Sequence, residues 1–399
     1  MASSKRSSQR TKLVHSGRHP HANHGVVNPP VYHASTILQP SLSAYEAARK
    51  PDWPGYRYGR TGTPTTRSFE EAVTEIYGAA GTVAVSSGLA AITNALLACV
   101  RAGDHILVMD NSYGPTRRFA NTFLDRFGVK TTYFDPAIGG HISSLFQENT
   151  VAVYTESPGS QTFEISDIPA ITEAAHKKGA TVLMDNTWAS ATYFDAFNKG
   201  VDIVVEAVTK YICGHSDVMM GVIVANKEWA EATRDMAKLN GDSVGPDDLY
   251  LAQRGLRTMA VRMEQNQANG IALAEWLSTR EEVKRVLHPA LPSNPGHALW
   301  KRDFTGASGL FSFVLKEGYT RAALAAMLDG LELYGMGASW GGYESLIIPV
   351  DPVDFRTATT WNEPGQLLRV HAGLEDIEDL IADLGGGLDR LSATTQTAM

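Results

Sequence analysis

Short apolar runs alternate with helical patterns through the middle of this chain, and this rhythm limits the fold more than any other feature of the sequence. A parallel pair of strands needs a long crossover, usually a helix, so parallel sheets are built from such alternation. We therefore expect an α/β fold with a mostly parallel sheet covered by helices. The expected strands are 105–109, 131–134, 151–155, 181–184, 203–208 and 222–225.

The chain has 399 residues, more than the length at which one hydrophobic core usually stops growing, so we expect more than one domain. Residues 1–62 are rich in Pro, Gly, His and Tyr and show no sustained period. We expect them to form an extended arm that contacts a neighbouring subunit. A helical pattern then runs from Ser68 to a stop at Gly78 and opens a larger domain, residues 63–258.

The last part of the chain predicts a smaller α+β domain, residues 259–399. Helical patterns over 248–283 form a bridge into it. Strands are expected near 310–314 and 367–370, followed by a closing helix from Glu375.

Composition excludes several classes of protein. The net charge of -8 and the pI near 5.8 argue against a nucleic-acid binder, which needs a basic face. Cys99 and Cys213 are too few for a disulfide framework, so we expect a cytoplasmic protein in a reducing compartment. The longest strongly apolar stretch, 89–100, is far shorter than the ~20 residues that a membrane span requires. We expect a core helix there and no membrane association.

A short histidine tract is the most obvious candidate for metal binding. The spacing of His19, His21 and His24 matches no closed zinc pattern, so we expect no metal site. Cys213 has no evident catalytic partners and is expected to be a packed thiol. The sequence also lacks the motifs of zinc proteases, of G-x-S-x-G hydrolases and of Walker-loop nucleotide-binding proteins.

Two of the apolar runs end on residues that could share a site. One ends on Asp185, and the run that starts at Asp202 leads to Lys210. Ligands of open α/β sheets collect at the carboxyl ends of strands, so both side chains are expected to face one crevice. A lysine amine can condense there with an aldehyde cofactor, while a carboxylate keeps a pyridine nitrogen protonated. For these two residues alone, a structural salt bridge at the sheet edge is the simpler interpretation.

A possible anion site strengthens the cofactor interpretation. The segment 83–89 enters a helix with Ser86 or Ser87 as its cap and Gly88 at its start. Free amide groups at such a helix start bind anions, including phosphate. Tyr113 follows another strand, where its ring could stack on a planar cofactor. A plain strand-turn-helix and a packing tyrosine are common alternatives, so these features gain weight only together.

Longer motifs, found in order along nearly the whole chain, resemble the Cys/Met metabolism enzymes that depend on pyridoxal phosphate (PLP). The resemblance implies the type I PLP-dependent transferase fold, like that of aspartate aminotransferase, with a mostly parallel sheet of the seven-stranded type. It also implies PLP as the cofactor and a homotetramer built from two tight dimers. The motifs are Tyr58-Gly-Arg-Thr-Gly-Thr-Pro-Thr, Asp185-Asn-Thr-Trp, Thr209-Lys-Tyr-Ile-Cys-Gly-His-Ser-Asp, Arg254-Gly-Leu-Arg-Thr-Met and Leu368-Arg-Val-His-Ala-Gly-Leu-Glu.

The resemblance implies roles for individual residues. Lys210 would be the Schiff-base lysine, Asp185 the partner of the pyridine nitrogen, and Tyr113 the stacking ring that also assists proton transfer. Arg369 would bind the carboxylate of the substrate, which suits its bidentate fork, with help from Ser339. The phosphate would be held by Gly88, Leu89 and Thr209, and by Tyr58 and Arg60 of the neighbouring subunit.

Three positions distinguish this chain within the family that it resembles. Ala207 stands where many relatives have Ser, so one hydroxyl contact to the phosphate is lost. The run from Ser157 to Gln161 replaces Ser-Pro-Thr-Asn-Pro, so the contact made by the usual Asn is in doubt, as is its replacement by Ser160. Trp340, an expected substrate contact, is typical of the β-eliminating branch, whereas γ-eliminating and γ-replacing relatives more often have Leu there.

The reaction implied is β-elimination of a small sulfur amino acid, L-cystathionine, to homocysteine, pyruvate and ammonia. This is a carbon–sulfur lyase step of transsulfuration and methionine biosynthesis. A γ-lyase, a γ-synthase, and a cysteine or cystine C–S lyase are alternatives within the family. A non-catalytic regulator that kept the fold is an alternative of another class, and the combined presence of Lys210, Asp185 and Arg369 argues against it.

Overall fold

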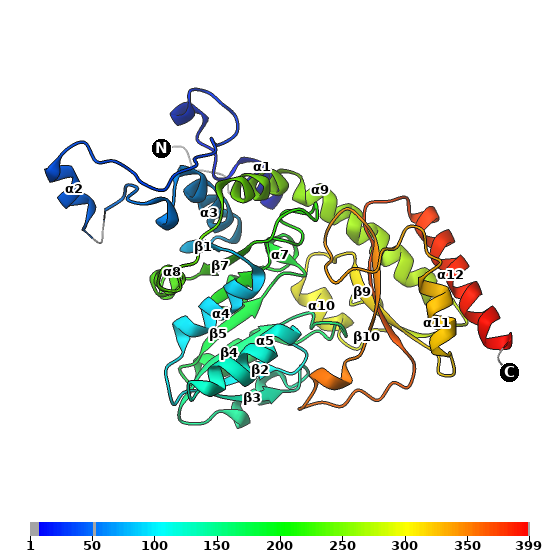
Figure 1. Cartoon of the computed structure of the whole chain (residues 1–399). Coiled ribbons are helices and arrows are strands. Elements are labelled where there is room, and N and C mark those ends of the chain that lie inside the picture. Colours follow the sequence, from blue (N-terminus) through cyan, green and yellow to red (C-terminus); the bar gives the residue numbers. More distant parts are fainter. Residues whose placement is uncertain (1–7, 51–52, 398–399) are drawn as a thin grey trace.

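The computed structural model describes residues 8–50 and 53–397, and its largest element is a mixed sheet with the strand order β1-β7-β6-β5-β4-β2-β3 (Figure 1). The strands β2 to β6 run parallel to one another, while β7 is antiparallel to both of its neighbours. The prediction of a mostly parallel sheet is confirmed. The strands are β1 Gly81–Val85, β2 His105–Met109, β3 Lys130–Phe134, β4 Thr150–Glu156, β5 Thr181–Asp185, β6 Ile203–Glu206 and β7 Gly221–Ala225.

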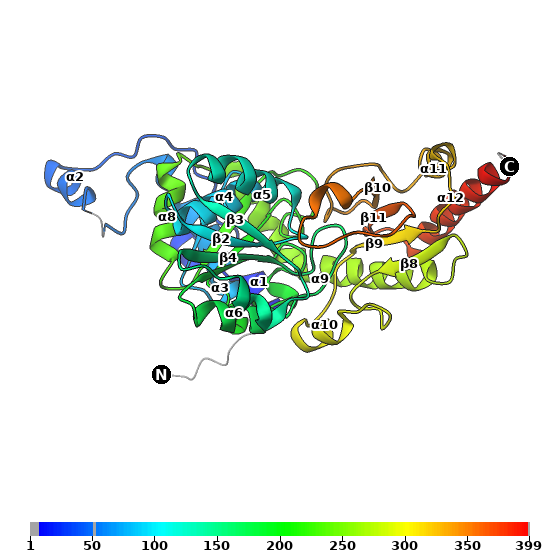
Figure 2. The ribbon, with the colours of Figure 1, turned by 90° about the horizontal axis from the view of Figure 1, so that it is seen from below.

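Helices cover both faces of this sheet, which is why inner strands such as β2 and β7 are buried along their whole length. Figure 2 shows α4 and α5 on one side of the sheet and α1, α3 and α6 on the other. The helix α3 begins at a Thr63 capping box and ends where Gly78 takes a left-handed conformation. The helices of this part are α1 Gln9–His15, α2 Leu42–Ala48, α3 Pro64–Tyr77, α4 Gly88–Cys99, α5 Gly114–Arg118, α6 Ile168–His176, α7 Ser190–Tyr193 and α8 Ala230–Leu239.

A single long helix, α9 (Pro246–Leu277), connects the large sheet to a smaller domain (Figures 1 and 2). Its Leu256 packs in the core of the large sheet, and its Leu273 and Leu277 pack in the core of the small domain. Residue 258, where we expected the larger domain to end, lies inside this helix. The small domain has an antiparallel sheet, β10-β11-β9-β8. Its elements are β8 Val283–Leu287, α10 His297–Asp303, β9 Leu310–Leu315, α11 Arg321–Leu328, β10 Leu346–Val350, β11 Leu367–His371 and α12 Ile377–Thr397.

The amino-terminal arm is not extended throughout, and that expectation is wrong in part. The helix α1 packs beside α9 and buries Leu13, and α2 lies far out on the projecting arm (Figure 1). Between and around these helices the arm exposes Val26, Val27, Leu38 and Leu42. These apolar side chains are open to solvent in the single chain.

Three strands escaped prediction from the sequence, and one was predicted too long. β1 and β10 lie at sheet edges and contain Gly81 and Pro349, residues that weaken a strand pattern. β8 carries two consecutive exposed basic residues, so it lacks a clear alternation. β6 ends at Glu206 because the chain turns there, with the Lys210 amide bonded to the Ala207 carbonyl at 3.0 Å.

Shorter helical turns join these elements. None of the helices in residues 8–50 and 53–397 combines the length and apolar character needed to cross a bilayer. The short turns are 3-10 helices at Pro20–Asn23, Gly59–Thr61, Gly139–Leu145, Phe197–Lys199 and Val353–Phe355, and a π-helix at Phe119–Leu124.

Candidate active site

The candidate site lies at the carboxyl edge of the parallel strands, where ligands of open α/β sheets bind. β4 ends at Glu156, β5 ends at Asp185, and β6 is followed by the turn that carries Lys210. The structure therefore brings Asp185 and Lys210 to one edge, as predicted. The small domain supplies the opposite wall through the segment that contains Ser339 and through Arg369 of β11.

Lys210 has the environment of a reactive amine. Its Nζ donates a hydrogen bond to Ser339 Oγ at 2.6 Å and lies 5.2 Å from the centroid of the Trp340 ring. Burial, and then the positive charge of Arg369, lower the pKa of Lys210 to about 8, although Asp185 acts in the opposite direction. A larger fraction of this amine is therefore neutral at physiological pH than in an exposed lysine.

The segment that carries Ser339 can approach Lys210 only because Gly341 lies in it. Gly341 has a φ of +84°, in the left-handed region, and a Cβ there would lie 3.1 Å from the Cα, C and Cβ atoms of Lys210. Any larger residue would push the segment away and lengthen the bond between Lys210 and Ser339. His371 supports the same segment through a 3.2 Å contact of its Nε2 with the Gly342 carbonyl.

Two hydrogen bonds from Thr187 support the carboxyl group of Asp185. Its Oδ1 accepts hydrogen bonds from the Thr187 amide at 2.9 Å and from Thr187 Oγ1 at 2.5 Å. The pKa of Asp185 is raised, because burial raises it more than the Thr187 bonds and the charge of Lys210 lower it. The hydroxyl of Thr187 also accepts from the Ala207 amide at 3.0 Å, which ties Asp185 to the turn that carries Lys210.

Tyr113 lies at the start of α5, in the turn that follows β2, and its side chain is 45% exposed toward the cleft. Its backbone N–H donates a 2.7 Å hydrogen bond to Glu156 Oε2. Burial, and then the charges of Asp185 and Glu156, raise the pKa of Tyr113, with Arg369 opposing. The phenol therefore keeps its proton at neutral pH and is a hydrogen-bond donor.

The start of α4 forms an anion cradle. Ser87 caps the helix by accepting from the Ala90 amide at 3.0 Å, and the next two amides, those of Gly88 and Leu89, bond to no other described residue. A Cβ on Gly88 would lie 2.7 Å from the Cβ of Ala207, so glycine lets the cradle sit against the Lys210 turn. Thr209 Oγ1 accepts a hydrogen bond from the Met220 amide at 2.9 Å and donates one to the Met220 carbonyl at 3.1 Å.

Arg369 points its guanidinium along the segment that precedes Trp340. Its Nη2 donates to the carbonyl groups of Ala338 and Ser339, both at 3.0 Å. Burial lowers the pKa of Arg369 to about 10, which leaves it charged at neutral pH. Its charge acts on both Lys210 and Tyr113, so it lies close to these residues, where an acid group of a substrate could bind.

Tyr58 and Arg60 lie on the arm, and their hydrogen bonds lead away from Lys210. Arg60 Nη1 donates to the Lys238 carbonyl at 3.0 Å, and the backbone of Tyr58 pairs with Thr36. The structure thus brings together Lys210, Asp185, Tyr113, Arg369, Ser339, Trp340 and the α4 cradle, while Tyr58 and Arg60 stand outside this group in the same chain.

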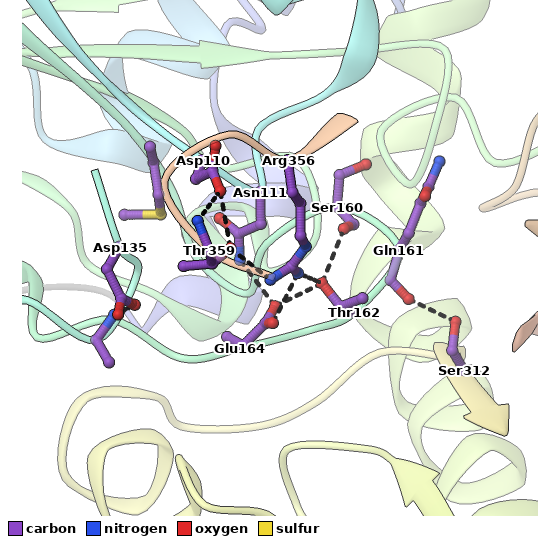
Figure 3. Close-up of polar contacts among 12 residues, drawn as sticks. Asp110, Asn111, Asp135, Ser160, Gln161, Thr162, Glu164, Ser312, Arg356 and Thr359 are labelled. Carbon is purple, nitrogen blue, oxygen red and sulfur yellow. Dashed lines mark hydrogen bonds and ion pairs between the residues drawn. The ribbon is translucent and has the colours of Figure 1, made fainter. Parts of the chain in front are cut away.

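One part of the site was missed in the sequence, namely Asp110 at the end of β2. Its fully buried carboxylate pairs with Arg117 at 2.9 Å and accepts from Thr357, Ala358 and Thr359 of the small domain at 2.8 to 3.2 Å. Figure 3 shows Asp110 bonded to Thr359. Burial raises the pKa of Asp110, but these hydrogen bonds outweigh that effect and hold it below its usual value. Like Asp185, Asp110 follows an apolar run, and that was the available signal.

A second set of bonds ties the same loop to the wall of the cleft (Figure 3). Arg356 donates to Glu164 Oε1 at 2.7 Å and to Thr162, and Glu164 Oε2 accepts from Asn111 Nδ2 at 2.9 Å. The Ser160 amide donates to the Asn111 carbonyl at 2.8 Å. The loop from the small domain is therefore bonded to Asp110 directly and to Asn111 through Glu164, and both residues come shortly before Tyr113. Neither Arg356 nor Glu164 was predicted.

The fold and this edge define a class of enzymes, those that bind a phosphate-bearing cofactor at a lysine beside a parallel sheet. The sequence pattern of the family described as "Cys/Met metabolism PLP-dependent enzyme" matches residues 10–389, and the chain belongs to this family. The type I fold and the PLP cofactor implied by the resemblance are thereby confirmed.

Named relatives agree with this family. The chain is 45% identical to "Cystathionine beta-lyase" of Salmonella typhimurium and 43% identical to "Cystathionine beta-lyase MetC" of Escherichia coli; each match covers 96% of this chain and 98% of the relative. Among solved structures, metB from Corynebacterium glutamicum superposes with a TM-score of 0.89 at 31% identity, over 98% of this chain and 100% of the other.

The residues of the site fit PLP on structural grounds as well. A cradle of free amides at Gly88 and Leu89 suits a phosphate, and the close contact with Ala207 leaves no room for a side chain on Gly88. A carboxylate and an amine with a lowered pKa stand at the next strand ends. This donor set suits an anionic aldehyde with a basic ring nitrogen.

Proposed function

We propose that this chain is a carbon–sulfur lyase that cleaves L-cystathionine by β-elimination and releases homocysteine, pyruvate and ammonia. The observation that carries the proposal is the Lys210 amine, whose pKa is lowered to about 8 and which is held between Ser339 and the Trp340 ring. An amine in this state can take up a proton near neutral pH. The two named cystathionine β-lyases give the substrate class.

Six residues are assigned to cofactor binding. Bound at Lys210, PLP would supply an electron sink that stabilises negative charge at the substrate α-carbon. We assign Asp185 to the ring nitrogen and Tyr113 to the ring face. The phosphate is assigned to the Gly88 and Leu89 amides and to Thr209, whose hydroxyl must then exchange its bond to the Met220 carbonyl.

Lys210 is the residue that we assign to removal of the substrate α-proton. The bond to Ser339 Oγ fixes the direction of Nζ, and the Trp340 ring covers one side of the amine and stabilises its charged form. Asp185 also favours the charged form, so the proton taken up is stabilised. The Tyr113 hydroxyl, which keeps its proton, is the donor available to a departing thiolate.

Arg369 is assigned to the substrate carboxylate. Its Nη2 is already bonded to two carbonyl groups, which fixes the guanidinium in one orientation and leaves the rest of the fork for a ligand. Ser339, which binds Lys210, belongs to the segment whose carbonyl groups hold Arg369. The same segment therefore positions both Lys210 and the residue assigned to the substrate carboxylate. Trp340 in that segment is our candidate for the choice between β- and γ-elimination.

We infer that the arm completes the site of a second copy of the chain. Tyr58 and Arg60 lie outside the cleft of their own chain, and the arm exposes apolar residues such as Val27 and Leu38. This supports a homotetramer of two tight dimers, with an arm (1–62), a PLP-binding domain (63–258) and a carboxyl-terminal domain (259–399). We also propose a cytoplasmic location and a role in transsulfuration and methionine biosynthesis.

A product assay tests the proposal. The protein, loaded with PLP, is incubated with L-cystathionine, and pyruvate is measured with lactate dehydrogenase while homocysteine is measured as free thiol. We expect the two products in equal amounts, and none with Lys210→Ala, whose folding is checked by circular dichroism. Formation of 2-oxobutyrate and cysteine would identify a γ-lyase, and racemised substrate without a thiol would identify a racemase. Either result, or no turnover, would refute the proposal.

A further inference from the structure

Glu156 lies beside Asp185 in the candidate site, but the mechanism proposed above gives its carboxyl group no role. It is the last residue of β4, and its register partner on the neighbouring parallel strand is Asp185. Register partners on adjacent strands project to the same face of a sheet, so the two carboxyl groups stand side by side.

The two carboxyl groups have unequal support. Asp185 accepts two hydrogen bonds from Thr187 and faces the positive charge of Lys210. Glu156 accepts one hydrogen bond, from the Tyr113 amide, and no cation pairs with it among residues 8–50 and 53–397. When two like charges share a poorly solvated site, the less supported group keeps its proton.

The titratable and charged groups around Glu156 all favour its neutral form. Asp185 on β5 is the nearest anion, and the phenols of Tyr154 on β4 and Tyr113 after β2 carry no charge at neutral pH. Lys210 and Arg369 act on Asp185 and Tyr113 rather than on Glu156. Burial, and then the charge of Asp185, raise the pKa of Glu156 well above its ordinary value.

The hydrogen bond from the Tyr113 amide lets this neutral carboxyl group hold the Tyr113 turn in place. Tyr113 is the residue directly before α5, and its backbone N–H donates to Glu156 Oε2 at 2.7 Å. On the other side, the turn is held through Asp110 and Asn111 by the loop from the small domain. Glu156 is thus the anchor of the Tyr113 turn on the cleft side.

We propose that Glu156 is a positioning residue: as a neutral carboxyl group beside ionised Asp185, it fixes the Tyr113 turn against the cofactor ring and leaves a single negative charge next to that ring. The inference rests on the proposed function, because it assigns the ring to the space between Tyr113 and Asp185. It distinguishes the two acids at this edge by charge, with Asp185 charged and Glu156 neutral.

Substitutions at Glu156 separate the charge from the hydrogen bond. Glu156→Gln keeps an acceptor oxygen and is neutral at every pH, whereas Glu156→Ala removes the anchor and Glu156→Asp withdraws it by one methylene. Glu148→Gln, an exposed residue shortly before β4, is the matched control. The readouts are the dissociation constant of PLP, the visible absorbance of bound PLP against pH, and kcat and KM.

We expect Glu156→Gln to match the wild type and Glu148→Gln within about twofold, with an unchanged absorbance–pH profile. Glu156→Ala and Glu156→Asp are expected to raise the PLP dissociation constant about tenfold, which corresponds to ~1.4 kcal/mol. In a Tyr113→Ala background the further loss from Glu156→Ala should vanish, because the turn then carries no ring for Glu156 to position.

A Glu156→Gln protein whose absorbance–pH profile shifts by a full pH unit would show that Glu156 is charged and would overturn the inference. Full additivity of Glu156→Ala and Tyr113→Ala would overturn its positioning role. If Glu156→Ala fails to fold, the Gln and Asp variants still decide. PLP binding without pyruvate release would remove only the proposed reaction, whereas a wild type that binds no PLP would overturn both.

Discussion

Removing the carboxylate of Asp110 should destabilise the protein more than almost any other single change near the cleft. Asp110 is fully buried, and its partner Arg117 has a side chain that is only 6% exposed. Breaking a buried ion pair by removing one partner leaves the other charge uncompensated and costs about 3–5 kcal/mol. Asp110→Ala also leaves the amides of Thr357, Ala358 and Thr359 without their acceptor.

The assay is unfolding of the cofactor-free protein by urea and by heat. With ~2 °C per kcal/mol for large domains, Asp110→Ala should lower the melting temperature by roughly 6 °C or more. Asp135→Asn is the control, because this exposed residue also follows a strand, but among the described residues its carboxylate accepts only from the Ala137 amide, at 2.8 Å. It should change stability by less than ~0.5 kcal/mol.

The pH dependence gives a second signature of Asp110. Its pKa is lowered in the folded state, so its stabilisation is complete above the unfolded value of ~3.9 and is lost as the pH falls through the lower folded value. The double variant Asp110→Ala/Arg117→Ala should lose less than the sum of the single losses. A loss no larger than that of Asp135→Asn, or strict additivity, would refute this account of the loop.

Two further predictions concern the cofactor site. Gly88→Ala places a Cβ 2.7 Å from that of Ala207, so the cradle must shift. In a fluorescence titration the PLP dissociation constant should rise at least tenfold, which corresponds to ~1.4 kcal/mol. Unchanged affinity would place the phosphate elsewhere. The pKa of Lys210 is lowered to about 8 in the folded protein, so between pH 8 and 10.5 the unfolded chain holds a proton that the folded chain has lost. The stability of the cofactor-free protein should therefore rise with pH across that window. Lys210→Met should lack that rise, and an identical pH profile for both proteins would show that the lysine is not perturbed.

The sequence predicted the sheet where strand patterns were strong and failed where they were weak. The apolar run 105–109 appears as β2 with the same bounds. β10 was missed because Pro349 lies in it, and such a proline is tolerated because β10 is an edge strand. The arm helix α1 depends on tertiary packing of Leu13, which a seven-residue pattern does not reveal.

For the site, local patterns predicted Asp185, Lys210 and the start of α4, because each follows directly from a strand end or a helix start. Arg369 and Ser339 were assigned only through the family resemblance, since they come from the other domain. The bond between Asp110 and Thr357 joins residues 247 apart in the chain, and no local pattern predicts such a pairing. The bond between Glu156 and Tyr113 depends in the same way on how β4 lies beside β2.

The central claim is that PLP is bound covalently at Lys210, and borohydride reduction followed by peptide mass spectrometry tests it directly. Reduction converts the imine into a stable pyridoxyl-lysine, which marks the attached residue. We predict the added mass on Lys210, in near-stoichiometric yield, and on no lysine of Lys210→Ala. An added mass on another lysine, such as Lys199 or Lys238, or none at all, would contradict the account.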